Sequence, residues 1–145
     1  MSSRRILPYF CRLIAVGACS SDATDPAGNG GGGGRTIKRD PSFAADIQEI
    51  FGRRRCSDAG CHGAAQTAGL DLRSGNARAS LVNVNATTAP QRVRVIPGDA
   101  QNSYLVIKLE GRQTAGDRMP RGLPALDNTD LTNIRNWISQ GAKAN

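Results

Sequence analysis

The sequence predicts an all-α fold for residues 41–145, and three observations lead to this prediction. The first is an apolar stripe at helical spacing in residues 43–51, and the second is a longer stripe in residues 131–138. The third is that loops and short extended pieces fill the space between them, with no internal repeat and no Rossmann or P-loop glycine pattern. The chain of 145 residues has room for one ordinary domain.

Residues 1–19 are predicted to form an export signal. Two arginines open the segment, an apolar run interrupted by Arg12 follows, and small residues precede Cys19. The run is too short and too interrupted to span a membrane. Residues 16–19 resemble a bacterial lipobox, which would make Cys19 the lipidated first residue of a protein held on the periplasmic side of a membrane. The alternative is an ordinary secretory signal with a chance cysteine.

Residues 20–40 are predicted to be a flexible linker. They show no hydrophobic period and include the glycine run 30–34. Such a segment buries too little apolar surface to offset the entropy of ordering it, and a glycine-rich coil of this length reaches about 25 Å. The linker would hold the following domain near the membrane while leaving it free to turn toward partners.

The folded domain is predicted to begin with a helix that ends near Arg55. Asp40 is placed to cap this helix, and Pro41 suits its first position. One face of the helix would carry four apolar residues, namely Phe43, Ile47, Ile50 and Phe51.

The last helix has the clearest boundaries. Asp127 is placed to cap it, and Asp130 three residues later resembles a capping-box partner. Gly141 is placed to end the helix. Its apolar face comprises Leu131, Ile134, Trp137 and Ile138, and we expect Trp137 to pack behind a cofactor or against the first helix.

Weaker signals fill the middle of the domain. Residues 69–73 and 90–96 are expected to be extended, and residues 77–82 form a weak helix candidate. Asp99 is placed to cap a further helix that contains Tyr104. A loop rich in glycine and proline follows in residues 111–124.

The residues that carry chemistry are Cys56, Cys61 and His62, the last being the only histidine of the chain. Covalent haem attachment needs two thiols for the vinyl groups and an adjacent imidazole for the iron, usually spaced Cys-x-x-Cys-His. A disulfide is an equal alternative on spacing alone, because exported cysteine pairs usually oxidise. A structural zinc site would be one ligand short, and a thioredoxin-like pair would be more closely spaced.

A series of motifs in residues 43–138 resembles the planctomycete-type cytochrome c domain, a family of small c-type cytochromes. The motifs include the first helix, Cys61-His62-Gly63 and the segment 69–73. The series continues with Ile96-Pro97-Gly98-Asp99, Ser103-Tyr104-Leu105, Arg118-Met119-Pro120 and Ile134-Arg135-Asn136-Trp137-Ile138.

The resemblance implies an all-α, small cytochrome c-like fold with covalently attached haem c. By position, Cys56 and Cys61 match the thioether cysteines, His62 the proximal iron ligand and Met119 the distal ligand. The spacer between the cysteines is two residues longer than the common form, and Gly60 is placed to help it turn back. Met119 is also the only methionine besides Met1, so a protein thioether ligand would have to be this residue.

These residues predict one-electron transfer to a redox partner protein rather than enzymatic catalysis, because His/Met ligation closes the coordination sphere of the iron. A haem enzyme or ligand-binding sensor, and a haem-free disulfide-bonded binding module, are the alternatives. The formal charge of +7 is scattered and does not predict nucleic-acid binding. The run 53–55 is the one basic cluster, and it suits a solvated helix end, an acidic partner or haem propionates.

Overall fold

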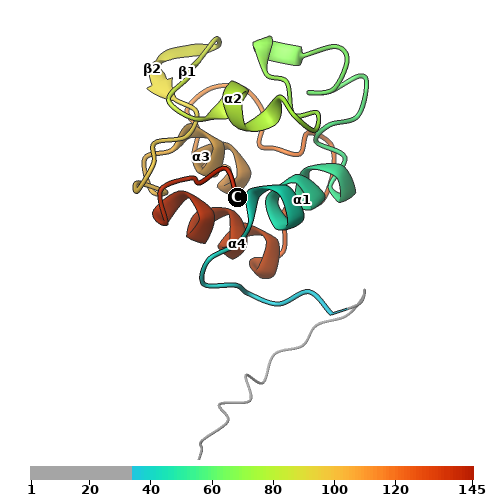
Figure 1. Cartoon of the computed structure of the whole chain (residues 1–145). Coiled ribbons are helices and arrows are strands. Elements are labelled where there is room, and N and C mark those ends of the chain that lie inside the picture. The colour runs from blue at the N-terminus through green and yellow to red at the C-terminus, as the bar shows by residue number, and fades with distance from the viewer. Residues whose placement is uncertain (1–33) are drawn as a thin grey trace, which may run out of the picture. The chain divides into compact units, whose positions relative to one another are not determined.

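The computed structural model describes residues 34–145, so the predicted leader, its lipobox at Cys19 and linker residues 20–33 lie outside the described residues. A π-helical turn (Phe43–Ile47) leads into the first helix, and a short 3-10 turn (Thr67–Gly69) follows it. The remaining elements are α1 (Gln48–Arg53), α2 (Ala77–Leu81), β1 (Asn85–Ala86), β2 (Ala89–Val93), α3 (Tyr104–Glu110) and α4 (Asn128–Ser139), as Figure 1 shows. No helix in this part of the chain is both long and apolar enough to cross a bilayer.

The prediction of an all-α fold is wrong, because β1 and β2 form a two-stranded antiparallel sheet. Asn85 pairs with Val93 and Ala86 pairs with Ala89, with an irregularity between them. The extended piece predicted in residues 90–96 exposes main-chain N–H and C=O groups that need partners. The two-residue strand β1 supplies some of these partners, because the turn after Ala86 folds β2 back along it. A strand as short as β1 leaves no alternating pattern in the sequence. The fold is therefore mixed.

The first helix starts and stops close to its predicted bounds, but its cap is a different residue. The Ser42 hydroxyl accepts a hydrogen bond from the Ala45 N–H at 3.2 Å, while the Asp46 carboxylate accepts one from the Ser42 N–H at 2.9 Å. Asp40 lies two residues before the cap position and instead faces Lys143, with 3.3 Å between Nζ and a carboxylate oxygen. The cap is reciprocal, as in a capping box.

Helix α4 supplies the centre of the core. Ile134, Trp137 and Ile138 are each at most 1% exposed. The rings of Phe43 and Trp137 pack with centroids 5.0 Å apart and planes tilted by 40°. Trp137 therefore packs against the first helical turn, which is the second of the two positions expected for it. The predicted cap of α4 is confirmed, because the Asp127 carboxylate accepts from the Asp130 N–H at 3.0 Å.

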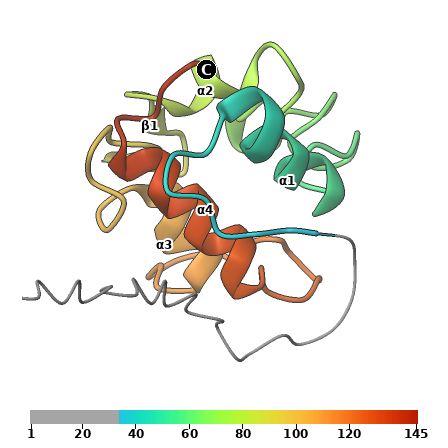
Figure 2. The same cartoon turned by 60° about the horizontal axis from the view of Figure 1, so that its bottom comes forward.

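Residues 35–40, here called the N-terminal strap, lie along α4 (Figure 2). The Asn133 side chain accepts a hydrogen bond from the Lys38 N–H at 2.8 Å and donates one to the Thr36 carbonyl at 3.0 Å. One Arg35 nitrogen lies 2.8 Å from both Asp127 and Asp130. The folded unit therefore begins at the strap, before Pro41. Residues 35–40, which were predicted to end the linker, belong to the folded unit.

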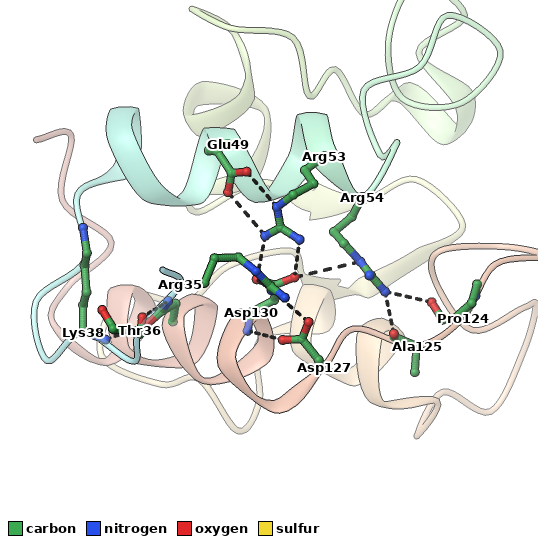
Figure 3. Close-up of polar contacts among 11 residues, drawn as sticks. Arg35, Thr36, Lys38, Glu49, Arg53, Arg54, Pro124, Ala125, Asp127 and Asp130 are labelled. Carbon is green, nitrogen blue, oxygen red and sulfur yellow. Dashed lines mark hydrogen bonds and ion pairs between the residues drawn. The ribbon is translucent and has the colours of Figure 1, made fainter. Parts of the chain in front are cut away.

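The basic run 53–55 at the end of α1 makes most of its contacts within the domain, as Figure 3 shows for Arg53 and Arg54. Arg53 forms two hydrogen bonds to the carboxylate of Asp130, at 2.7 and 3.0 Å, although Asp130 comes from α4. Arg54 donates to the carbonyls of Pro124 and Ala125. These arginines join α1 to α4 and to the loop before it, so the helix end is not a purely solvated one.

Candidate functional site

The segment between Cys56 and Gly63 folds into a closed loop directly after α1. The His62 N–H donates to the Cys56 carbonyl at 3.1 Å, which joins the first and last residues of the motif. Inside the loop, the Asp58 carbonyl accepts from the N–H groups of Cys61 at 2.9 Å and Gly63 at 3.0 Å. The four-residue spacer therefore brings the second cysteine and the histidine back to the first cysteine.

Gly63 is the glycine that this loop requires. A Cβ atom at this position would lie 2.3 Å from the Ser57 carbonyl oxygen and 2.6 Å from that of Asp58, closer than any side chain allows. Gly60, which the sequence singled out, has open space where a Cβ atom would point, with no atom within 4 Å, and it does not adopt a positive φ. The loop turns back through the close approach at Gly63, so the expectation for Gly60 was wrong.

The two thiols differ in their surroundings. Cys56 is half-buried and packs against the hydrophobic core, whereas Cys61 is exposed. Burial raises the pKa of the Cys56 thiol to about 11. Neither thiol is part of a disulfide in the described part of the chain. Both are therefore available as thiols within one short loop.

His62 is held in one tautomer. Its Nδ1 lies 2.9 Å from the Thr67 carbonyl oxygen, which can only accept, so Nδ1 carries the proton. The lone pair of the ring is then on Nε2. Metal-binding histidines in proteins are commonly fixed in this way, through a hydrogen bond from the second nitrogen to a carbonyl. Burial lowers the pKa of His62, and the charges of Arg94 and Lys108 lower it further, which favours the neutral ring.

Met119 comes from a different part of the chain, the loop after α3. Its side chain is half-buried and packs against the same apolar cluster as Cys56 and Leu70. Its N–H donates to the Lys108 carbonyl at 2.9 Å. Lys108 is also near enough for its charge to act on His62. The structure thus unites Cys56, Cys61 and His62 in one loop, while Met119 packs against the same hydrophobic cluster from the loop after α3.

Arg94 is a residue of this region that sequence reasoning missed. It is only 7% exposed, and its guanidinium donates to the carbonyls of Ser80, Ala68 and Gly69 and to the Thr87 hydroxyl, at 2.8 to 3.2 Å. All of these acceptors are neutral. Burial lowers the pKa of Arg94. Its cationic side chain therefore lies inside the protein beside the loop of His62, without a carboxylate among these acceptors.

The described residues offer two thiols, an imidazole protonated on Nδ1, a thioether that packs against the apolar cluster and a buried positive charge. Thiols and an imidazole in this order suit the covalent attachment of a porphyrin and the binding of its iron, so the residues fit haem c. No known family model matches the chain, and neither a curated protein nor a solved structure is significantly similar to it.

Proposed function

We propose that residues 41–145 bind one haem c and transfer single electrons. Cys56 and Cys61 would form the two thioether bonds, His62 would be the proximal ligand and Met119 the distal one. The observation that carries the proposal is the hydrogen bond from His62 Nδ1 to the Thr67 carbonyl, inside a loop that closes Cys56 onto His62. It supports the motif independently of the all-α fold that the resemblance implied, which this chain does not have.

The bound haem would supply an iron that cycles between the ferrous and ferric states. The chain's own residues set the conditions for that cycle. Thr67 fixes the ring of His62, the apolar cluster next to Cys56 and Met119 excludes water, and Arg94 provides a positive charge in a low-dielectric position. A cofactor that carries two propionates suits a site with such a charge, because a buried cation is costly without a counter-ion.

The tether belongs to the same proposal. Lipid attached at Cys19 would hold the domain on the periplasmic side of a bacterial membrane, with a redox partner protein as the donor or acceptor. Cys19→Ala should abolish lipid labelling of the protein in a Gram-negative host. A wild-type protein that is already fully soluble in the periplasm would refute this part.

Attachment is tested on the full chain, expressed with export and a c-type maturation system. The wild-type protein should keep its haem stain after denaturation and acid-acetone extraction, and replacing both Cys56 and Cys61 with serine should abolish the stain. Ser57→Ala, in the same spacer but without a thiol, is the matched control and should behave as wild type. An intact Cys56–Cys61 disulfide recovered by peptide mapping, with no haem bound, would instead support a binding module.

Ligation is tested by absorption spectroscopy of the same protein. His/Met ligation predicts a six-coordinate low-spin haem in both redox states and a weak far-red band from the ferric sulfur–iron bond. Met119→Ala should remove the band, lower the reduction potential and admit carbon monoxide, and His62→Ala should impair maturation itself. Rapid binding of carbon monoxide to the unmodified ferrous protein would favour a sensor or enzyme over an electron carrier.

A further inference from the structure

The main chain of Met119 is held at both of its polar groups. Its N–H donates to the Lys108 carbonyl in the last turn of α3 at 2.9 Å. Its carbonyl accepts from Nη1 of the preceding residue, Arg118, at 3.2 Å. The other terminal nitrogen of the same guanidinium donates to the Leu123 carbonyl at 2.9 Å. The Arg118 side chain therefore bridges the start and the end of the turn 119–123.

Arg118 is itself fixed by the end of α3. Gly111 ends that helix with a φ of +75°, and a Cβ atom there would lie 3.2 Å from Cδ and 3.4 Å from Cγ of Arg118. The aliphatic stem of Arg118 thus lies directly on the glycine. Both of its guanidinium hydrogen bonds go to main-chain carbonyls. The Arg118 side chain therefore holds both ends of the turn 119–123.

We infer that Arg118 is the positioning residue that keeps the thioether of Met119 directed at the haem iron, an inference that rests on the proposed haem ligation. Arg118 does not itself need to contact the iron or the sulfur. A thioether is a weak ligand, so the fraction of protein in which it is bound depends on how tightly its loop is held. Without the Arg118 side chain, the turn keeps the hydrogen bond from the Met119 N–H to Lys108 but loses those to the carbonyls of Met119 and Leu123. The loop would then sample orientations in which the thioether leaves the iron open.

The chain offers a matched control in the same turn. Arg121 pairs with Asp117 at 3.0 Å, and these side chains are 78% and 61% exposed. Replacing Arg121 removes the same charge from the same loop without removing a hydrogen bond to Met119. Any purely electrostatic effect on the haem should therefore appear in both variants, whereas the loss of positioning should appear only at Arg118.

The experiment compares wild type, Arg118→Ala, Arg118→Lys and Arg121→Ala as full-length holoproteins. The readouts are the ferric far-red band, the reduction potential and the rate at which the ferrous protein binds carbon monoxide. Losing a hydrogen bond from a charged donor should shift the balance between bound and released Met119 about tenfold, so carbon monoxide binding should accelerate by a similar factor in Arg118→Ala. Arg118→Lys should lie between this variant and wild type, and Arg121→Ala should match wild type.

The outcomes separate the two claims. A wild-type protein that lacks the far-red band refutes the proposed ligation, whatever the variants do. A wild-type band that persists unchanged in Arg118→Ala, with carbon monoxide binding no faster than in Arg121→Ala, overturns the role of Arg118 alone. If Arg118→Ala does not fold, Arg118→Lys decides, because lysine keeps the charge but has one terminal nitrogen in place of the two that bind the Met119 and Leu123 carbonyls separately. An undisturbed band in that variant also overturns the inference.

Discussion

Asp130 lies at the junction of α1, α4 and the N-terminal strap, and replacing it with asparagine tests how these parts are held together. Its side chain is 1% exposed. One carboxylate accepts two hydrogen bonds from Arg53, at 2.7 and 3.0 Å, and one from Arg35 at 2.8 Å. In Asp130→Asn, the charge is lost and an amide NH₂ group faces donors instead of accepting from them.

The expected loss follows from the exposure of the partners. Removing one member of a buried ion pair costs about 3–5 kcal/mol, because the other charge stays behind in the interior. Here Arg53 and Arg35 are 31% and 30% exposed, so both guanidinium groups can turn toward water. We therefore discount the cost to about 2–3 kcal/mol. For a domain of this size that corresponds to a fall of roughly 8–12 °C in Tm.

The assay is urea unfolding of the full chain, monitored by far-ultraviolet circular dichroism. The midpoint and the slope of the free energy of unfolding against urea concentration are compared between variants. Asp127→Asn is the matched control. It also removes a negative charge beside Arg35, but its side chain is 42% exposed and an asparagine can still cap α4. We expect a loss below about 1 kcal/mol there. Equal losses in the two variants would refute the argument, since they would show that burial of the carboxylate does not matter.

Three further predictions concern single contacts. Gly63→Ala should lower the free energy of unfolding by about 1–3 kcal/mol, because its Cβ would meet the Ser57 carbonyl at 2.3 Å, whereas Gly60→Ala should be neutral in the same urea titration. Hydrogen bonds from Arg73 hold the pKa of Asp71 well below its usual range, so its contribution to stability is complete above the unfolded pKa of about 4 and is lost as the pH falls below it. Asp71→Asn should therefore be less stable than wild type at neutral pH, with a gap that narrows on acidification in melts across that range. Arg94→Met should cost about 2–4 kcal/mol and accelerate amide hydrogen exchange in residues 67–69, because it frees carbonyl groups that the guanidinium now binds; unchanged exchange would argue against that role.

Local signals in the sequence were sufficient for the helices but not for the sheet or the ion pairs. The stripes of apolar residues placed the first and last helices, and Asp127 was correctly expected to cap α4. The side chain of Asp130 was expected to complete that cap. It instead binds Arg53 and Arg35, which are 77 and 95 positions away in the sequence. A short window of sequence cannot contain such partners, so its preference for a local bond was overruled by tertiary contacts.

The caps of the other helices failed for a related reason. Asp40 and Asp99 are both good capping residues, but Ser42 and Ser103 occupy the positions next to the helices. Asp99 instead accepts a hydrogen bond from the Asn102 N–H at 3.0 Å, and its carbonyl accepts from the buried Ser103 hydroxyl at 2.7 Å. Several residues that can cap stand close together, and the main-chain turn before α3 decides among them. Residue type alone therefore placed these boundaries within a few residues, but not their hydrogen bonds.

Arg94 shows how the same limit affects the candidate site. Val93 and Val95 flank Arg94 in the extended segment, so alternation alone would put Arg94 on the opposite, solvated face. Val95 is indeed fully buried, but Arg94 is only 7% exposed because the turn 67–69 covers the other face. That turn also supplies the carbonyl that holds His62. The guanidinium and the imidazole are thus both tied to residues 67–69, so a change in this turn acts on the buried charge and on the proposed iron ligand together. The motif in the sequence located the two thiols and the histidine. The buried guanidinium and the turn 67–69 that hold this region in place come only from the fold.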